Sequence, residues 1–281
     1  MRIDAHHHLW TLARGDYGWL TPKLAPIYRD FTFADLAPHL ASGRIEGTIL
    51  VQAAATEAET LFLLQIATGR ETVRGVVGWT DFDATDGEAR IEAMAAHDLL
   101  VGLRPMVQDI PDDDWLLRPA LAPLLTAMAG HRLVFDALVL PRHLARLLPI
   151  VDRHPELQFV LDHFGKPALS TGELDVWRRD IALLAERDNI VCKLSGLVTE
   201  ARPDWQLADL RGAVEHVISC FGPRRMLWGS DWPVVDLAGG YAKWLGAAET
   251  LLADLPSDER ADVFGGTAAR IYLSERGRPI C

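Results

Sequence analysis

A histidine triplet near the N-terminus is the clearest chemical signal in the sequence. Residues 4–10 (DAHHHLW) overlap and follow a short apolar stretch at residues 2–5, which we predict to be the first strand. Side chains two residues apart project to the same side of a strand, so His6 and His8 share one face and His7 takes the other. Two imidazoles one pleat apart can ligate a divalent ion or serve as a general base. The triplet therefore predicts a metal or catalytic site.

Eight short apolar runs recur along the chain, each followed by a segment of helical periodicity. The predicted strands are residues 2–5, 47–52, 73–79, 99–104, 133–136, 158–162, 190–194 and 226–229. They lack clean polar alternation, which is typical of parallel strands covered on both faces. No glycine-rich phosphate loop follows any of them, which disfavours a doubly wound open sheet. We predict an α/β protein with a (β/α)8 TIM barrel, and one domain over residues 1–281.

Polar residues gather where these strands end, and chemistry in a TIM barrel takes place there. Asp231 follows the eighth strand, and its ordinary pKa would keep it ionised as a general base for water. A helix cap is the alternative role for this aspartate. His163 follows the sixth strand and precedes a turn, which favours a place at the barrel mouth over a place in the core.

Two cations lie on buried strands and have two possible roles. Arg104 ends the fourth strand and Lys193 lies within the seventh. Each could stabilise an oxyanion at the site, or each could pair structurally with a carboxylate. The structural partners that we expect are Asp109 or Asp136 for Arg104, and Glu200 or Asp231 for Lys193.

Aromatic residues flank the candidate site. Trp10 follows the histidine triplet and Trp232 follows Asp231, so either ring could contact a sugar-like or other cyclic substrate. The aromatic, proline-containing residues 11–30 are predicted to form the first βα loop, lying over the site.

The composition limits the classes of partner that the protein could bind. The 281 residues carry a formal net charge of −11, which argues against nucleic acid or an anionic membrane and favours a small-molecule substrate. No apolar stretch reaches about 18 residues, and no signal peptide is visible. Cys192, Cys220 and Cys281 have no metal-binding spacing, so we expect a cytoplasmic, reduced protein. The sequence carries no signal for oligomeric state.

Five motifs together resemble the amidohydrolase superfamily, and its sugar-lactonase branch above all. They are residues 4–10 (DAHHHLW), 103–109 (LRPMVQD), 161–167 (LDHFGKP), 193–197 (KLSGL) and 228–233 (WGSDWP). That branch includes L-fucono-lactone and L-rhamnono-lactone hydrolases and 2-pyrone-4,6-dicarboxylate lactonase. The resemblance extends from residue 1 to about residue 273, and five motifs in order are far more specific than any one alone.

The resemblance implies a distorted barrel whose metal ligands are His6, His8, His163 and Asp231. Arg104 stands where a carboxylated lysine or a glutamate would bridge two ions, and Asp136 stands where a histidine would lie. A binuclear centre is therefore not expected. The resemblance implies at most one divalent ion, zinc or manganese, and leaves open whether activity requires it.

The expected reaction is hydrolysis of a sugar lactone by water that Asp231 deprotonates, with His163, Arg104 and Lys193 as the other catalytic groups. Hydrogen bonds to substrate hydroxyls are expected from Gln52, Gln108, Asp109 and Glu200. The alternatives are a lactone isomerase, a dicarboxylate lactonase, a metal-dependent decarboxylase of the same superfamily and a non-catalytic binding protein. A dicarboxylate would need several arginines, and decarboxylases usually carry a glutamate where this chain has Asp4.

Overall fold

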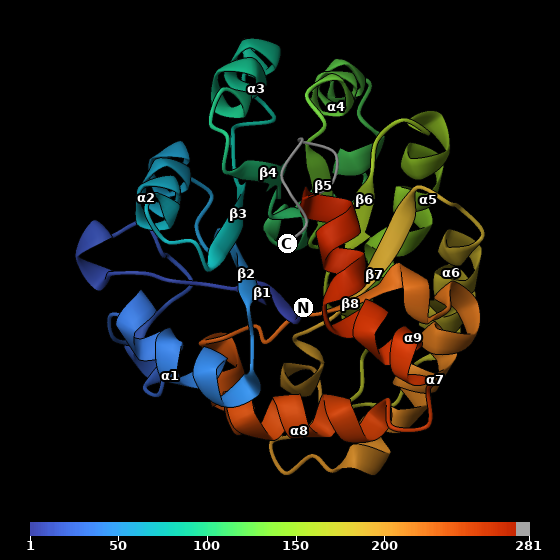
Figure 1. Ribbon diagram of the computed structural model, residues 1–281. Helices are drawn as coiled ribbons and strands as arrows, with labels where there is room; N and C mark the ends of the chain where they lie inside the picture. The colour runs from blue at the N-terminus through green and yellow to red at the C-terminus, as the bar shows by residue number, and fades with distance from the viewer. Residues whose placement is uncertain (274–281) are drawn as a thin grey trace.

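Eight parallel strands alternate with helices around a central axis (Figure 1). The computed structural model describes residues 1–273, so Cys281 lies outside the described residues. The strands are β1 Ile3–His7, β2 Gly47–Val51, β3 Val73–Gly78, β4 Leu100–Leu103, β5 Val134–Ala137, β6 Phe159–Leu161, β7 Ile190–Leu194 and β8 Met226–Trp228. The α-helices are α1 Phe33–Gly43, α2 Glu57–Ala67, α3 Gly87–Ala95, α4 Leu121–Gly130, α5 Leu144–Arg153, α6 Asp175–Ala185, α7 Leu207–Phe221, α8 Tyr241–Leu251 and α9 Ser257–Ala261.

The strands pair in sequence order from β1 to β8, which confirms the predicted (β/α)8 barrel. β1 and β8 meet only near their carboxyl ends, where the backbone N–H of Asp231 donates to the His6 carbonyl at 2.7 Å. The N–H of His8 donates to the Trp232 carbonyl, also at 2.7 Å. The register between β1 and β2 also shifts between Asp4 and His7. The barrel is thus distorted, and its closing bonds involve residues of the candidate site.

The first strand is longer than predicted. β1 reaches His7, whereas the apolar pattern ends at residue 5. The expectation that the whole triplet follows the strand was wrong, because residues 6–8 bond to residues 231 and 232 and continue the extended backbone. The other seven strands lie within their predicted ranges to a residue or two.

Small and β-branched side chains fill the barrel interior, as expected for strands covered on both faces. The last helical turn, Ala269–Leu273, closes the amino-terminal end of the barrel and packs against these interior side chains (red in Figure 1). The interior side chains that the strands contribute are Ile3, Ala5, Ile49, Val51, Val77, Val101, Val134, Val160, Val191 and Leu227.

The segment after β1 is the long loop that the sequence predicts. Residues 11–30 contain two short 3-10 turns, Leu12–Arg14 and Pro22–Leu24. The backbones of Trp10 and Phe31 bond to each other in both directions, at 3.1 and 2.9 Å, and so tie the two ends of the loop together. Across residues 1–273, no helix has the length and apolar character needed to cross a membrane.

A close backbone contact near the C-terminus provides a stability test. A Cβ atom on Gly265 would lie 2.3 Å from the Met1 carbonyl oxygen, so the start of β1 would have to shift in Gly265→Ala. We expect this variant to lose about 1–3 kcal/mol of unfolding free energy in urea denaturation. Gly246→Ala is the matched control, since its Cβ would meet no atom within 4 Å. This control should gain up to about 1 kcal/mol from helix propensity. Equal stability of the two variants would contradict the prediction.

Candidate active site

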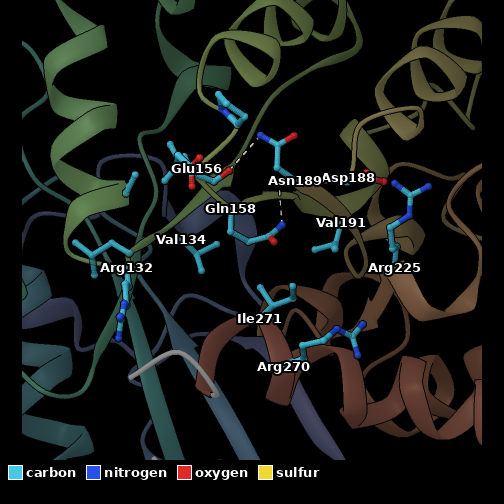
Figure 2. Close-up of a pocket in the computed structure, with 14 residues that line it drawn as sticks. Arg132, Val134, Glu156, Gln158, Asp188, Asn189, Val191, Arg225, Arg270 and Ile271 are labelled. Carbon is cyan, nitrogen blue, oxygen red and sulfur yellow. Dashed lines mark hydrogen bonds between the residues drawn. The ribbon is translucent and has the colours of Figure 1, made fainter. Parts of the chain in front are cut away.

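A cavity of about 430 Å³ lies at the amino-terminal ends of β5, β6 and β7 (Figure 2). Its polar side chains already hold the backbone together. Arg225 donates to three carbonyl oxygens, and the amide of Asn189 donates to three more. The amide of Gln158 donates to the Asn189 carbonyl at 3.0 Å. This cavity is therefore built for stability rather than for a reaction, as expected at this end of a TIM barrel.

A second cavity, of about 190 Å³, lies at the carboxyl-terminal ends of the strands. It contains six of the predicted site residues, which makes it the candidate active site. Its lining residues are His8, Trp19, Ala53, Arg104, Met106, Gln108, Asp109, Leu138, His163, Lys166, Thr199, Asp231 and Val234.

Asp231 forms the polar floor of this cavity. Its Oδ1 lies 3.2 Å from Nε2 of His8 and 3.6 Å from Nε2 of His6. Burial alone would raise the pKa of Asp231, but the neighbouring imidazoles of His163, His8 and His6 lower that pKa below its usual range. The carboxylate is thus ionised at neutral pH and can accept a proton.

Three residues could hold one metal ion. Ligand atoms of His6, His163 and Asp231 all lie within 4.8 Å of one another and are buried. His8 supports this interpretation, because its Nδ1 donates to the Val51 carbonyl at 2.8 Å. In the neutral ring the Nε2 lone pair then faces the carboxylate of Asp231, an arrangement that calls for a proton or a cation. The donor set of imidazoles and a carboxylate suits zinc.

His163 is held by the turn after β6 and by β7. Its Nδ1 lies 2.9 Å from the hydroxyl oxygen of Ser195, a buried contact that fixes the ring. Burial lowers the pKa of His163 to about 4, although Asp231 and Asp162 act in the opposite direction. The ring is therefore neutral at physiological pH.

Arg104 reaches the cavity but pairs with a residue that the sequence analysis did not select. Its Nη1 lies 3.2 Å from Oδ2 of Asp162 and 3.3 Å from Nε2 of His6. The expected pairing with Asp109 or Asp136 was wrong, because Asp162 at the end of β6 faces the axis. Gln52 does not line the cavity. Its side-chain amide donates to the Arg104 backbone carbonyl at 2.7 Å, and the backbone carbonyl of Gln52 accepts from the Arg104 guanidinium.

Lys193 lies inside the barrel, below the cavity. Its ammonium nitrogen is 2.6 Å from Oδ2 of Asp136 and 2.8 Å from Oδ1 of Asp162, with all three side chains fully buried. The expected pairing with Glu200 or Asp231 was wrong, because a side chain on β7 that faces the axis meets β5 and β6 first. Glu200 instead lies 3.6 Å from Lys166, which does line the cavity.

The two predicted ring-binding tryptophans do not line the cavity. Trp10 and Trp232 are buried and pack edge-on against Phe31 at the base of the loop, with ring centroids 5.5 and 5.1 Å away. Trp19 lines the cavity in their place, and its Nε1 donates to the Ala53 carbonyl at 2.7 Å. The sequence analysis did not select Trp19, although it lies in the segment predicted to cover the site.

The cavity wall formed by Gln108 and Asp109 has polar groups that remain available to a ligand. Gln108 donates to Oδ2 of Asp109 at 3.3 Å, and both residues line the cavity as predicted. The Oε1 atom of Gln108 is buried and accepts no hydrogen bond from the described residues. Such an acceptor is ready for a hydroxyl of a bound molecule.

A (β/α)8 barrel with histidines on β1, a histidine after β6 and an aspartate after β8 defines a TIM-barrel enzyme with its site at the carboxyl ends of the strands. The chain belongs to the amidohydrolase family, whose model, described as "Amidohydrolase", matches residues 3–273.

Characterised relatives are similar over nearly the whole chain. L-fucono-1,5-lactonase of Burkholderia ambifaria is 44% identical over 279 residues, which cover 98% of this chain and 96% of that protein. L-fucono-1,5-lactonase of Burkholderia multivorans is 35% identical, with 97% and 96% covered. A crystal structure of an amidohydrolase from Burkholderia multivorans with bound Zn is 35% identical, with a TM-score of 0.92 over 97% of this chain and 99% of that one.

Proposed function

We propose that this protein is a lactonase that hydrolyses a sugar lactone to the open hydroxy acid. The observation that carries the proposal is the meeting of Asp231, His163 and Arg104 in one cavity of about 190 Å³. Two lactonases with 44% and 35% identity over almost the full chain support the substrate class.

The reaction that these groups support begins with a water molecule on Asp231. The carboxylate takes one proton while the oxygen attacks the lactone carbonyl carbon. The Arg104 guanidinium supplies positive charge beside the oxygen on which negative charge develops. Asp231 passes its proton to His163, and the C–O bond of the ring breaks as His163 delivers that proton to the leaving oxygen. One water is consumed and one carboxylic acid is produced.

One divalent ion, zinc or manganese, would be held by His6, His163 and Asp231, with His8 beside them. When bound, such an ion acts as a Lewis acid toward the carbonyl and lowers the pKa of water. We propose that it assists the reaction without being required, because Arg104 already places a positive charge at the site and a lactone is a reactive ester. Hydrolysis that disappears entirely after chelation and returns with zinc would contradict this part of the proposal.

The cavity walls suit a neutral, hydroxyl-rich ring better than a dicarboxylate. Gln108 and Asp109 offer hydrogen bonds on one side, and Trp19 offers an aromatic face. Only two cationic side chains, Arg104 and Lys166, are among the described lining residues, and Lys166 is already close to Glu200. These contacts favour the sugar lactone over the dicarboxylate lactone.

The role of Asp231 is tested by Asp231→Asn. Asparagine tolerates the left-handed backbone of this position (φ 57°), so we expect the fold to persist. Turnover of L-fucono-1,5-lactone should fall about a thousandfold, because the amide cannot accept the proton from water. A pH-indicator assay measures the acid released, and circular dichroism checks the fold.

Near-normal turnover by a folded Asp231→Asn would remove Asp231 from the mechanism. The same assay tests the reaction class in the wild-type protein, since hydrolysis releases one acid equivalent per lactone. Conversion of lactone without acid release would point to an isomerase, and release of CO2 would point to a decarboxylase.

The position of His163 depends on a glycine. A Cβ on Gly196 would lie 2.4 Å from Nδ1 of His163 and 3.0 Å from Oδ2 of Asp231, at a φ of +56°. Gly196→Ala should displace the ring and lower turnover about a hundredfold. Gly172→Ala is the control, because φ is +78° there and a Cβ meets nothing within 4 Å. Both variants carry similar backbone strain, so equal turnover would show that crowding at His163 has no role.

Trp19 is expected to contribute to substrate binding. Trp19→Ala should raise KM for the sugar lactone about tenfold through the loss of ring contact. It should change kcat less than twofold, since the indole is not needed at the reacting carbonyl. Trp19→Phe loses the same bond to Ala53 but keeps an aromatic face, so its KM should lie close to the wild-type value. An unchanged KM in Trp19→Ala would exclude this role.

A further inference from the structure

Lys193 is a buried cation that the proposed reaction does not use. Its side chain is fully buried, and it is absent from the lining of the active-site cavity. Two carboxylate oxygens accept hydrogen bonds from its ammonium nitrogen, Oδ2 of Asp136 at 2.6 Å and Oδ1 of Asp162 at 2.8 Å, and Nδ1 of His6 lies 3.4 Å away. An ammonium only donates, so two carboxylates at hydrogen-bond distance match its chemistry.

The same set of ligands would also suit a divalent ion. Carboxylates are typical ligands of zinc and manganese, and zinc binds them at about 2.0–2.2 Å. The distances around Lys193 are those of hydrogen bonds, so the cage has the dimensions of an ammonium rather than a metal ion. His6 lies between the two positions, because its Nδ1 faces Lys193 and its Nε2 faces Asp231 at 3.6 Å.

We propose that the ammonium of Lys193 is a built-in cation that occupies a second cation position of the barrel and limits the protein to one divalent ion. The occupied position is the cage of Asp136 and Asp162, beside His6. The position left for an ion is the one formed by His6, His163 and Asp231.

A count of buried charges supports the proposal. Three carboxylates lie at these two positions and are matched by two cations, Lys193 and Arg104; the carboxylates are Asp136, Asp162 and Asp231. One divalent ion would change an excess of one negative charge into an excess of one positive charge. A second ion beside Lys193 would leave three positive charges in excess in a buried site, which is strongly unfavourable.

The surroundings of the cage keep the ammonium charged. Asp136 and Asp162 hold the ammonium at 2.6 and 2.8 Å, and two carboxylates at this distance stabilise a buried positive charge. The hydroxyl of Tyr272 donates to both oxygens of Asp136, at 2.9 and 2.8 Å, and so fixes this carboxylate in place. The Lys193 ammonium therefore occupies this position in the folded protein.

Metal content provides the test. We would incubate the wild-type protein, Lys193→Met and the double variant Lys193→Met/Asp136→Asn with excess zinc or manganese. After gel filtration, mass spectrometry of the metal gives the number of ions per chain. The wild-type protein should hold no more than one ion. Lys193→Met should hold one more than the wild type, and the double variant should return to the wild-type number because the cage has lost a carboxylate.

Thermal unfolding provides a second readout. Lys193→Met leaves buried carboxylates without their cation, so we expect a lower Tm that rises by several degrees with added zinc. With added zinc, the Tm of the double variant should rise no more than that of the wild type, because its cage has lost a carboxylate. Two ions in the wild type, or no additional ion in a folded Lys193→Met, would overturn the proposal. So would a Lys193→Met that fails to fold even with metal while the double variant folds. These counts do not depend on the substrate, so a failure to hydrolyse lactones would leave them unaffected.

Discussion

The structure depends on a network of buried charges along the barrel axis. Lys193 bridges Asp136 and Asp162, and Asp162 in turn pairs with Arg104. Each of these ions would be costly to bury alone, and each is acceptable only because its partners are held at hydrogen-bond distance. The backbone of β4 to β7 must therefore keep these strand ends in register. The same network lies directly beneath the polar floor of the cavity, so stability and site geometry have one origin.

The backbone hydrogen bonds that close the barrel between β1 and β8 lie beside that network of charges. β1 and β8 bond to each other through residues 6–8 and 231–232, and the same short stretches carry His6, His8 and Asp231. The backbone that closes the barrel thus sets the distances among the polar groups. A conventional ladder along the whole of β1 and β8 is not needed, because the last helical turns pack against the lower part of this seam.

Much of this arrangement could be predicted from the sequence. The eight apolar runs predict the strands, and the polar residues at their ends include six that line the cavity. Pairing partners could not be predicted, because Arg104 and Lys193 meet Asp162, a residue whose direction depends on how β6 sits between its neighbours. Trp19 was missed for a similar reason. Its place depends on the path of a loop without periodicity, whereas Trp10 next to the histidines belongs to the base of that loop.

The contact between Tyr272 and Asp136 has a consequence for how the protein is made. The hydroxyl that fixes Asp136 belongs to the last helical turn of residues 1–273, which reaches the barrel only after every strand has been synthesised. A chain synthesised only as far as β8 thus contains the central lysine and carboxylates but lacks the hydroxyl that donates to Asp136. Assembly of the catalytic end of the barrel is in this way linked to completion of the opposite end.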